Sequence, residues 1–403
     1  MNFSKILCIA ASLFLGACNS PENPVIQSEY VVQLDSVPGN CPYLTKDHKG
    51  NIVMSWVRRQ QDSGHVFCYA ISVDGGNSFS APIIIPGSDN IQPHGENLPK
   101  IIFKPSGETI ALWGAANPSP RNKYSGMVYY SQSFDGGVSW SKPTRLVKDT
   151  AGNDQRYYDV ALLENGEAAI MWLDNRKIIP QEGSSLYYAV TQGRSGFQNE
   201  RMIGEGCCPC CRTDLFIDSK SGIHVLYRGI LQDSIRDMVH RVSIDGGNSF
   251  SAPVRISNDN WVINGCPHTG PSMTENRAGL HFAWFTGGSR KGSYYTRSVD
   301  NGKSFKEHDQ VSLLGSHPQL AALSNGALAI VWDETVSRDG KFNKRIGMQV
   351  RGNEGTAAPR EFITPDSSIA SYPVITSVNN HIIVAYAMKK GNHDFIFYQR
   401  LKR

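Results

Sequence analysis

Short runs of alternating apolar and polar residues recur along the chain, each starting at a turn glycine or asparagine and ending in an aromatic residue. Alternation with a period of two predicts β-strands, and patterns with the period of a helix are nearly absent. Successive aromatic ends lie about 48 to 59 residues apart, which is enough for four short strands and their loops. The seven runs are 50–56, 107–113, 166–172, 222–227, 279–284, 326–332 and 380–386.

Repeats of four strands predict a β-propeller in which each repeat forms one blade. An apolar run before each alternating run, such as 98–103, would be the innermost strand of its blade. The seventh repeat reaches Arg403 before a fourth strand can form, and segment 30–34 has the strand pattern to complete it and leave no exposed sheet edge. We therefore predict an all-β, single-domain propeller over residues 29–403, with seven blades favoured and six as the alternative.

Four stretches of eight residues are close copies of one another, with serine first, aspartate third, glycine fifth, serine seventh and an aromatic residue last. Between two strands this pattern predicts a hairpin loop, in which the aspartate binds the amides of its own turn and glycine takes the positive φ. An aspartate used in this way stabilises a blade and is not catalytic. We call these stretches the repeat loops: 72–79, 133–140, 243–250 and 298–305.

The repeat loops match the Asp-box, or BNR repeat, and through them the chain resembles the sialidase (neuraminidase) superfamily. The resemblance implies a propeller of the same blade design and an activity on glycans as a glycosidase. Familiar sialidases have six blades, so a seventh blade would limit the likeness to the superfamily level.

The resemblance also implies a set of catalytic residues. Sialidases hold the substrate carboxylate with three arginines, attack with a tyrosine that is paired with a glutamate, and use an aspartate as acid and base. Tyr372 opens the last inner strand and could match the nucleophile, with Glu96 as its partner. The first of the three arginines is missing, because the first inner strand begins at Cys41. Arg212 and Arg228 could bind a carboxylate.

Side chains with catalytic potential gather at the predicted entries to the inner strands. In a propeller these entries meet at one end of the axis, where ligand sites usually lie. The candidates are two histidines, two carboxylates and two tyrosines: His94, Glu96, Tyr158, Asp159, His317 and Tyr372.

Three functions fit this set. The first is an enzyme that acts on an acidic glycan, either a glycoside hydrolase or a uronate lyase. A lyase needs a base, such as His94 or His317, an acid, such as Tyr158 or Tyr372, and a cation that holds the uronate carboxylate. The set resembles that of seven-bladed ulvan lyases, which also carry a structural zinc. The second function is glycan binding without catalysis, and the third is metal binding.

The loops expected beside these entries carry about twice as many cations as acids, although the net charge of the whole chain is only +4. Such a rim would attract an anionic ligand, for example an acidic oligosaccharide or polysaccharide; the alternative is that these are ordinary solvated loops. No basic tract is interleaved with aromatic residues, which argues against a nucleic-acid partner. The arginines that we expect to bind substrate are Arg176, Arg212, Arg228 and Arg236.

Six of the nine cysteines lie at strand entries, including the sequence Cys207-Cys208-Pro209-Cys210-Cys211. Because export exposes thiols to an oxidising compartment, disulfides are the favoured prediction, for example from Cys210 or Cys211 to Cys41 or Cys266. The alternative is a structural zinc or copper site, since thiolate and imidazole are the ligands that these metals prefer. Its candidate ligands are Cys207, Cys208, Cys210, Cys211, Cys266 and His268.

Residues 1–17 have the pattern of a bacterial lipoprotein signal peptide. Lys5 precedes a short apolar run that ends in small residues before Cys18, the expected site of lipidation. A plain secretory signal cut nearby is the alternative. Residues 18–28 would form a flexible tether. The sequence thus predicts a monomer that is lipid-anchored to a membrane of the bacterial cell envelope.

Overall fold

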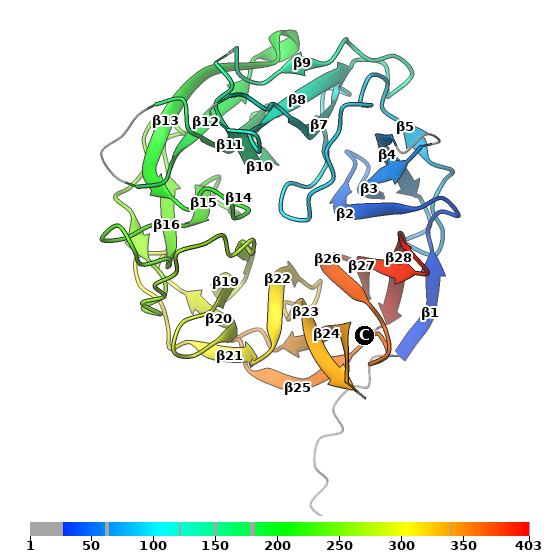
Figure 1. Ribbon diagram of the computed structural model, residues 1–403, viewed down its shortest axis with the longest axis vertical. Helices are drawn as coiled ribbons and strands as arrows, with labels where there is room; N and C mark the ends of the chain where they lie inside the picture. Colours follow the sequence, from blue (N-terminus) through cyan, green and yellow to red (C-terminus); the bar gives the residue numbers. More distant parts are fainter. Residues whose placement is uncertain are drawn as a thin grey trace, which may run out of the picture.

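The computed structural model describes residues 27–60, 64–120, 122–148, 151–177, 182–338 and 340–402. They form seven four-stranded antiparallel sheets, arranged as a ring of blades around one axis (Figure 1). The predicted all-β propeller with seven blades is confirmed, and the six-bladed alternative is wrong.

Blades 1 to 6 are each built from four strands that follow one another in the sequence, with the first strand innermost. Blade 1 contains β2 (Gly39–Lys46), β3 (Ile52–Arg59), β4 (His65–Ser72) and β5 (Ile83–Ile84). Blade 2 contains β6 (Lys100–Phe103), β7 (Thr109–Ala116), β8 (Gly126–Ser133) and β9 (Thr144–Arg145). Blade 3 contains β10 (Gln155–Leu162), β11 (Ala168–Asp174), β12 (Ser184–Thr191) and β13 (Phe197–Cys207), with the short 3-10 helix η2 (Gly193–Ser195) before β13. Blade 4 contains β14 (Asp214–Ile217), β15 (Ile223–Arg228), β16 (Met238–Ser243) and β17 (Val254–Arg255). Blade 5 contains β18 (Ser272–Asn276), β19 (Gly279–Thr286), β20 (Gly292–Ser298) and β21 (Asp309–Ser312). Blade 6 contains β22 (Gly315–Ala322), β23 (Leu328–Arg338), β24 (Lys341–Arg351) and β25 (Ala357–Phe362).

Blade 7 joins the two ends of the described chain. It contains β26 (Ala370–Val378), β27 (His381–Lys390), β28 (His393–Lys402) and, as its outer strand, β1 (Gln27–Gln33). β1 pairs antiparallel with β28, beside which it lies in Figure 1. The predicted closure of the ring by an N-terminal strand is therefore confirmed. The strand begins at Gln27, so the last two residues of the predicted tether belong to the sheet.

The aromatic residue that ends each alternating run is buried between neighbouring blades. Five of these residues are tryptophans that are at most 1% exposed. Removing about 200 Å² of each from water contributes roughly 5 kcal/mol, so the repeat in the sequence is also the repeat of the core. The five are Trp56, Trp113, Trp172, Trp284 and Trp332.

The four repeat loops share one hydrogen-bonding pattern. In the first, Asp74 Oδ1 accepts from the Ser72 hydroxyl at 2.8 Å and from the Ser78 amide at 3.0 Å, and Asp74 Oδ2 accepts from the Ser78 hydroxyl at 2.6 Å. Ser72 Oγ in turn accepts from the amide of Gly76, which has φ +87°. The aspartate is occupied by its own turn, as predicted.

Among the described residues, no helix has the length and apolar character needed to cross a bilayer. The expected signal peptide, the lipidation site Cys18 and residues 18–26 of the expected tether lie outside the described residues.

Candidate functional site

Five of the seven inner strands are entered through a residue other than glycine in the left-handed region, with φ between 49° and 56°. At four of these entries the register of the strand pair shifts as in a β-bulge. Each such residue costs on the order of 1–2 kcal/mol, and bulges redirect side chains. The fold therefore stores strain at equivalent points around one end of the axis. The five residues are Cys41, Tyr157, His268, His317 and Tyr372.

Ring contacts link these entries across the axis. The segment between β5 and β6 reaches towards the centre of the ring (Figure 1), and its His94 ring lies 5.5 Å, between centroids, from the rings of both Tyr157 and His268. The His317 and Tyr372 rings are 4.2 Å apart, and His317 Nε2 lies 3.1 Å from the His268 carbonyl. We call the five residues linked by these contacts the mouth: His94, Tyr157, His268, His317 and Tyr372. Blades 2, 3, 5, 6 and 7 thus meet there, as the strand entries predicted.

Glu96 and Arg212 are bonded to each other beneath the mouth. Glu96 is 0% exposed, and its carboxylate lies 2.9 Å from Arg212 Nη1 and accepts from the backbone amides of Arg212 and Gly270. Arg212 Nη2 donates to the carbonyls of Gly270, Pro271 and Pro318. This ion pair ties blades 2, 4, 5 and 6 together, and its hydrogen-bonding groups are already used within the protein.

Tyr158 and Asp159 are engaged in the same way. The Tyr158 hydroxyl lies 2.6 Å from the Leu98 carbonyl, and the side chain is 1% exposed. Asp159 forms an ion pair with Lys100, which is itself buried. These contacts are between inner strands, below the mouth. Among the predicted catalytic residues, these two and Glu96 therefore lie inside the wall of the propeller.

The remaining three candidates reach the mouth. His317 Nδ1 lies 2.8 Å from Asp333; burial alone would lower the pKa of His317, but Asp333 outweighs this and the pKa is raised. Burial lowers the pKa of His94 from 6.5 to about 4, and His268 adds to the effect. Burial raises the pKa of Tyr372 to about 12, with nearby Glu96 also contributing. Near neutral pH, the mouth therefore presents a neutral His94 and a protonated tyrosine.

The sequence did not indicate Asp214, which lies near Asp159. Burial and the charge of Asp159 raise the pKa of Asp214 from 3.8 to about 8, while its carboxylate accepts from the Met273 amide. A buried carboxyl group with a strongly raised pKa is a common feature of catalytic sites. Asp214 can be identified only from the tertiary structure, because burial and the nearby Asp159 cause its pKa shift.

The predicted substrate arginines have partners within the protein. Arg176 pairs with Asp174 and Glu200, and Arg236 pairs with Glu182. The excess of positive charge expected on the rim is thus reduced, because several of the loop cations meet acids from neighbouring segments.

Arg228 is 1% exposed, and its guanidinium donates to backbone carbonyls of Arg236, Thr269 and Phe285 at 2.8 to 3.0 Å. Among the described residues it forms no ion pair with a carboxylate, and its Nε has no partner.

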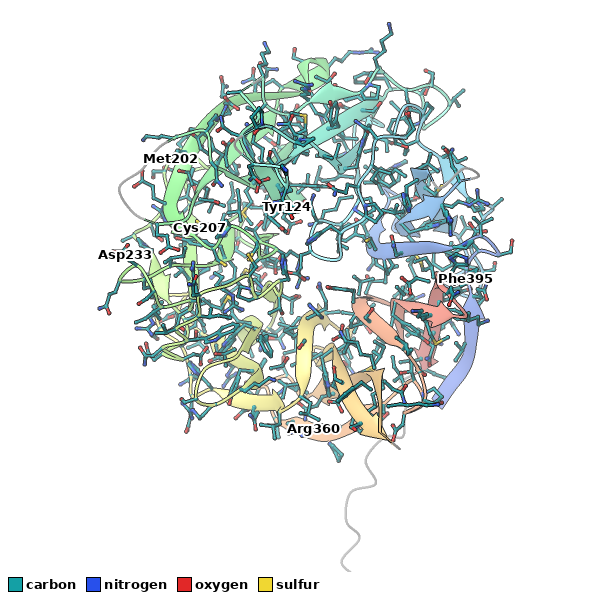
Figure 2. All side chains as sticks on the ribbon, in the orientation of Figure 1. Tyr124, Met202, Cys207, Asp233, Arg360 and Phe395 are labelled. Atoms are coloured by element: carbon teal, nitrogen blue, oxygen red, sulfur yellow. The ribbon has the colours of Figure 1, made fainter. Side chains whose placement is uncertain are left out.

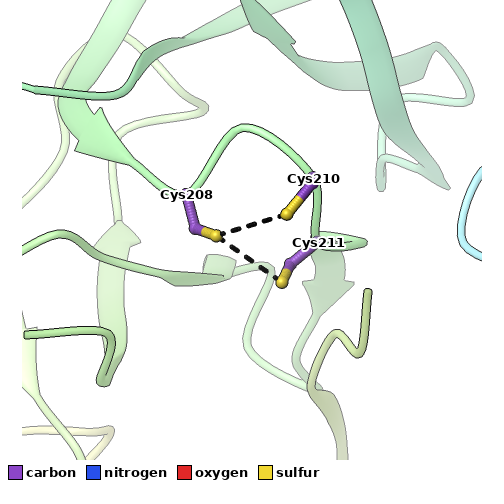
Figure 3. Close-up of side chains that lie close together, drawn as sticks. All are labelled: Cys208, Cys210 and Cys211. Atoms are coloured by element: carbon purple, nitrogen blue, oxygen red, sulfur yellow. Dashed lines mark hydrogen bonds between the residues drawn. The ribbon is translucent and has the colours of Figure 1, made fainter. Parts of the chain in front are cut away.

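Three cysteines in the connection between β13 and β14 form a compact group. Cys208 Sγ lies 3.7 Å from the Sγ atoms of both Cys210 and Cys211 (Figure 3). All seven described cysteines are free thiols, so the favoured disulfides are not seen among them; a disulfide needs a separation of about 2.05 Å. Cys207 points elsewhere, with its sulfur 3.9 Å from the Glu205 carbonyl.

A polar pocket of about 360 Å³ lies where blades 1 and 7 meet, and the sequence analysis did not single it out. Arg59 Nη1 lies 2.9 Å from His393 Nδ1 in this pocket, and Arg59 forms no ion pair among the described residues. Burial and the charge of Arg59 lower the pKa of His65 below 6.5. We call it the seam pocket; its polar lining is Asn40, Arg59, His65, Asn392, His393 and Asp394.

Comparison with known proteins finds the same fold in solved structures. The BP39L lectin from Burkholderia pseudomallei aligns with a TM-score of 0.58 and 11% identity over 89% of this chain and 98% of the lectin. A protein of unknown function from Dyadobacter fermentans aligns with a TM-score of 0.55 and 14% identity over 94% of this chain and 100% of that protein. A mutant of the NanB sialidase from Streptococcus pneumoniae aligns with a TM-score of 0.50 and 15% identity over 93% of this chain and 70% of the sialidase.

The chain therefore shares the β-propeller fold of these solved structures. No family model matches it, and no curated protein matches it. At 11 to 15% identity the likeness concerns the fold and does not extend to the site.

Proposed function

We propose that this protein binds an acidic carbohydrate in the seam pocket and does not cleave it. The observation that carries the proposal is Arg59, a cation without an acidic partner among the described residues, in a pocket large enough for a small ligand. Around it are two imidazoles, two amides and a carboxylate, which are groups that hydrogen-bond to sugar hydroxyls.

An unpaired acceptor also lines this pocket. Asn40 Oδ1 is buried and has no hydrogen-bond partner among the residues that the structure describes. A buried acceptor without a donor costs about 1–3 kcal/mol, so a ligand hydroxyl that donates to it would recover this cost. A carboxylate on the same sugar would bind Arg59 with charge-assisted hydrogen bonds.

Binding rather than hydrolysis is supported by the state of the predicted catalytic groups. Glu96 is bound to Arg212, and Asp159 is bound to Lys100. A Tyr372 nucleophile would therefore lack a free glutamate, and a substrate carboxylate would lack the free arginines that sialidases use. The solved lectin of similar fold is consistent with binding. A lipid anchor at Cys18, predicted from the sequence, would hold such a protein at the cell envelope.

The test is calorimetry with sialylated, uronate, sulfated and neutral oligosaccharides, together with product analysis. We expect binding of acidic glycans without product, and at least a tenfold loss in Arg59→Gln, since a charge-assisted bond contributes more than 1.4 kcal/mol. Arg360→Gln is the matched control, because Arg360 is an exposed arginine at the outer edge of the ring (Figure 2). Release of product that is lost in Tyr372→Phe would support the enzyme instead, and unchanged binding in Arg59→Gln would refute the seam pocket.

A further inference from the structure

The group formed by Cys208, Cys210 and Cys211 has the dimensions of a metal site. The three side chains are at most 4% exposed, and their sulfur atoms all lie within 4.8 Å of one another, with two of the distances at 3.7 Å. Pro209 at the second position of a tight turn fixes this arrangement locally. A tetrahedral zinc with zinc–sulfur distances of about 2.3 Å requires sulfur atoms about 3.8 Å apart. The thiols are thus spaced as zinc ligands would be.

A second group of possible ligands lies between this cluster and solvent. Cys210, Cys266 and His268 have ligand atoms within 4.8 Å of one another, and Cys266 is exposed. His268 Nδ1 is buried and has no hydrogen-bond partner in the described part of the chain. Because Cys210 belongs to both groups, potential ligands run continuously from exposed Cys266 to buried Cys208.

Arg228 provides an independent indication of negative charge at the cluster. It is 1% exposed without a carboxylate partner among the described residues, and it interacts electrostatically with Cys208 and Cys211. Its carbonyl accepts from the Cys208 amide at 2.8 Å, which holds the two segments together. A buried guanidinium needs a compensating anion.

We propose that Cys208, Cys210 and Cys211 bind one Zn²⁺ ion as thiolates, and that Cys266 and His268 pass the ion in from solvent. Three thiolates and Zn²⁺ carry a net charge of −1, which the charge of Arg228 balances. Each thiol gives up its proton as the metal binds. This site is separate from the seam pocket, so it does not depend on the proposed carbohydrate ligand.

The first experiment measures zinc content and affinity in the purified, reduced protein by elemental analysis and competition with a chromogenic chelator. We expect one zinc per chain and at least a hundredfold weaker binding in Cys208→Ser/Cys211→Ser. The matched control is Cys207→Ser, which changes an adjacent buried cysteine outside both groups and should leave affinity unchanged. Equal zinc loss in the control, or no zinc in the wild type, would overturn the proposal.

The second experiment separates holding from delivery. In Cys266→Ser/His268→Ala we expect zinc transfer from the chelator to slow at least tenfold, while the final content stays at one per chain. An unchanged rate would refute the entry path. If the Cys208→Ser/Cys211→Ser variant fails to fold, the wild-type protein can be loaded with Co²⁺ and its absorption spectrum recorded. We expect a cobalt–thiolate charge-transfer band. Its absence, or peptide mapping that finds a disulfide within residues 208–211 of the protein as isolated, would refute the metal site.

Discussion

Removing the carboxylate of Glu96 should weaken the whole ring, because this one side chain meets residues from several blades. Glu96→Ala deletes an ion pair of 2.9 Å with Arg212 and leaves the amides of Arg212 and Gly270 without their acceptor. Breaking a buried pair from one side costs about 3–5 kcal/mol, since the remaining charge stays buried. We therefore expect a loss of about 3–5 kcal/mol in the free energy of unfolding.

Urea unfolding followed by tryptophan fluorescence measures this loss as a shift of the midpoint. Asp366→Ala is the control, because the Arg345–Asp366 pair of 2.7 Å is half exposed on the Asp366 side and should contribute about 1 kcal/mol or less. The double variant Glu96→Gln/Arg212→Met removes both charges and should recover much of the loss. If Glu96→Ala costs no more than Asp366→Ala, the pair does not hold the blades together and the reasoning is wrong.

Three further predictions concern the effect of single substitutions on stability. The pKa of Asp214 is about 8 in the folded protein, above its ordinary 3.8, so its contribution to stability falls as pH rises between these values. Asp214→Asn should therefore raise the melting temperature, by an amount that grows from pH 5 to pH 8. A gain that does not depend on pH would contradict this. Hydrogen bonds from Ser249 lower the pKa of Asp245 from 3.8 to about 2, so the stability that the Asp245 carboxylate contributes is present above pH 4 and is lost as pH falls through 2. The melting temperature of Asp245→Asn should therefore fall less steeply with decreasing pH in this range than that of the wild type. A Cβ at Gly95 would lie 2.5 Å from the Tyr372 ring, so Gly95→Ala should cost about 1–3 kcal/mol in urea unfolding, whereas the unobstructed Gly352→Ala should cost far less.

Parts of the candidate site could be predicted from the sequence because they are local. The Cys208–Cys211 turn and the residues at strand entries, such as His94 and His317, follow from one blade at a time once the repeat is recognised. Their partners could not be predicted. Arg212 has the sequence context of a substrate-binding arginine, yet Glu96, which is 116 positions away, occupies it.

The sequence by itself determined the architecture of this protein. Alternation with a period of two, an aromatic residue once per repeat and a spare strand at the start dictate seven sheets closed into a ring, because each signal acts within one blade or between neighbours. Only the tertiary structure decided which charges are free. Arg59 and His393 lie 334 positions apart and meet because the first and last blades close the ring. Burial then decided the chemistry: among the described residues it left Arg228 without a carboxylate partner and close to the thiols of Cys208 and Cys211. No pattern along the chain records how far a charge lies from water or from an opposite charge.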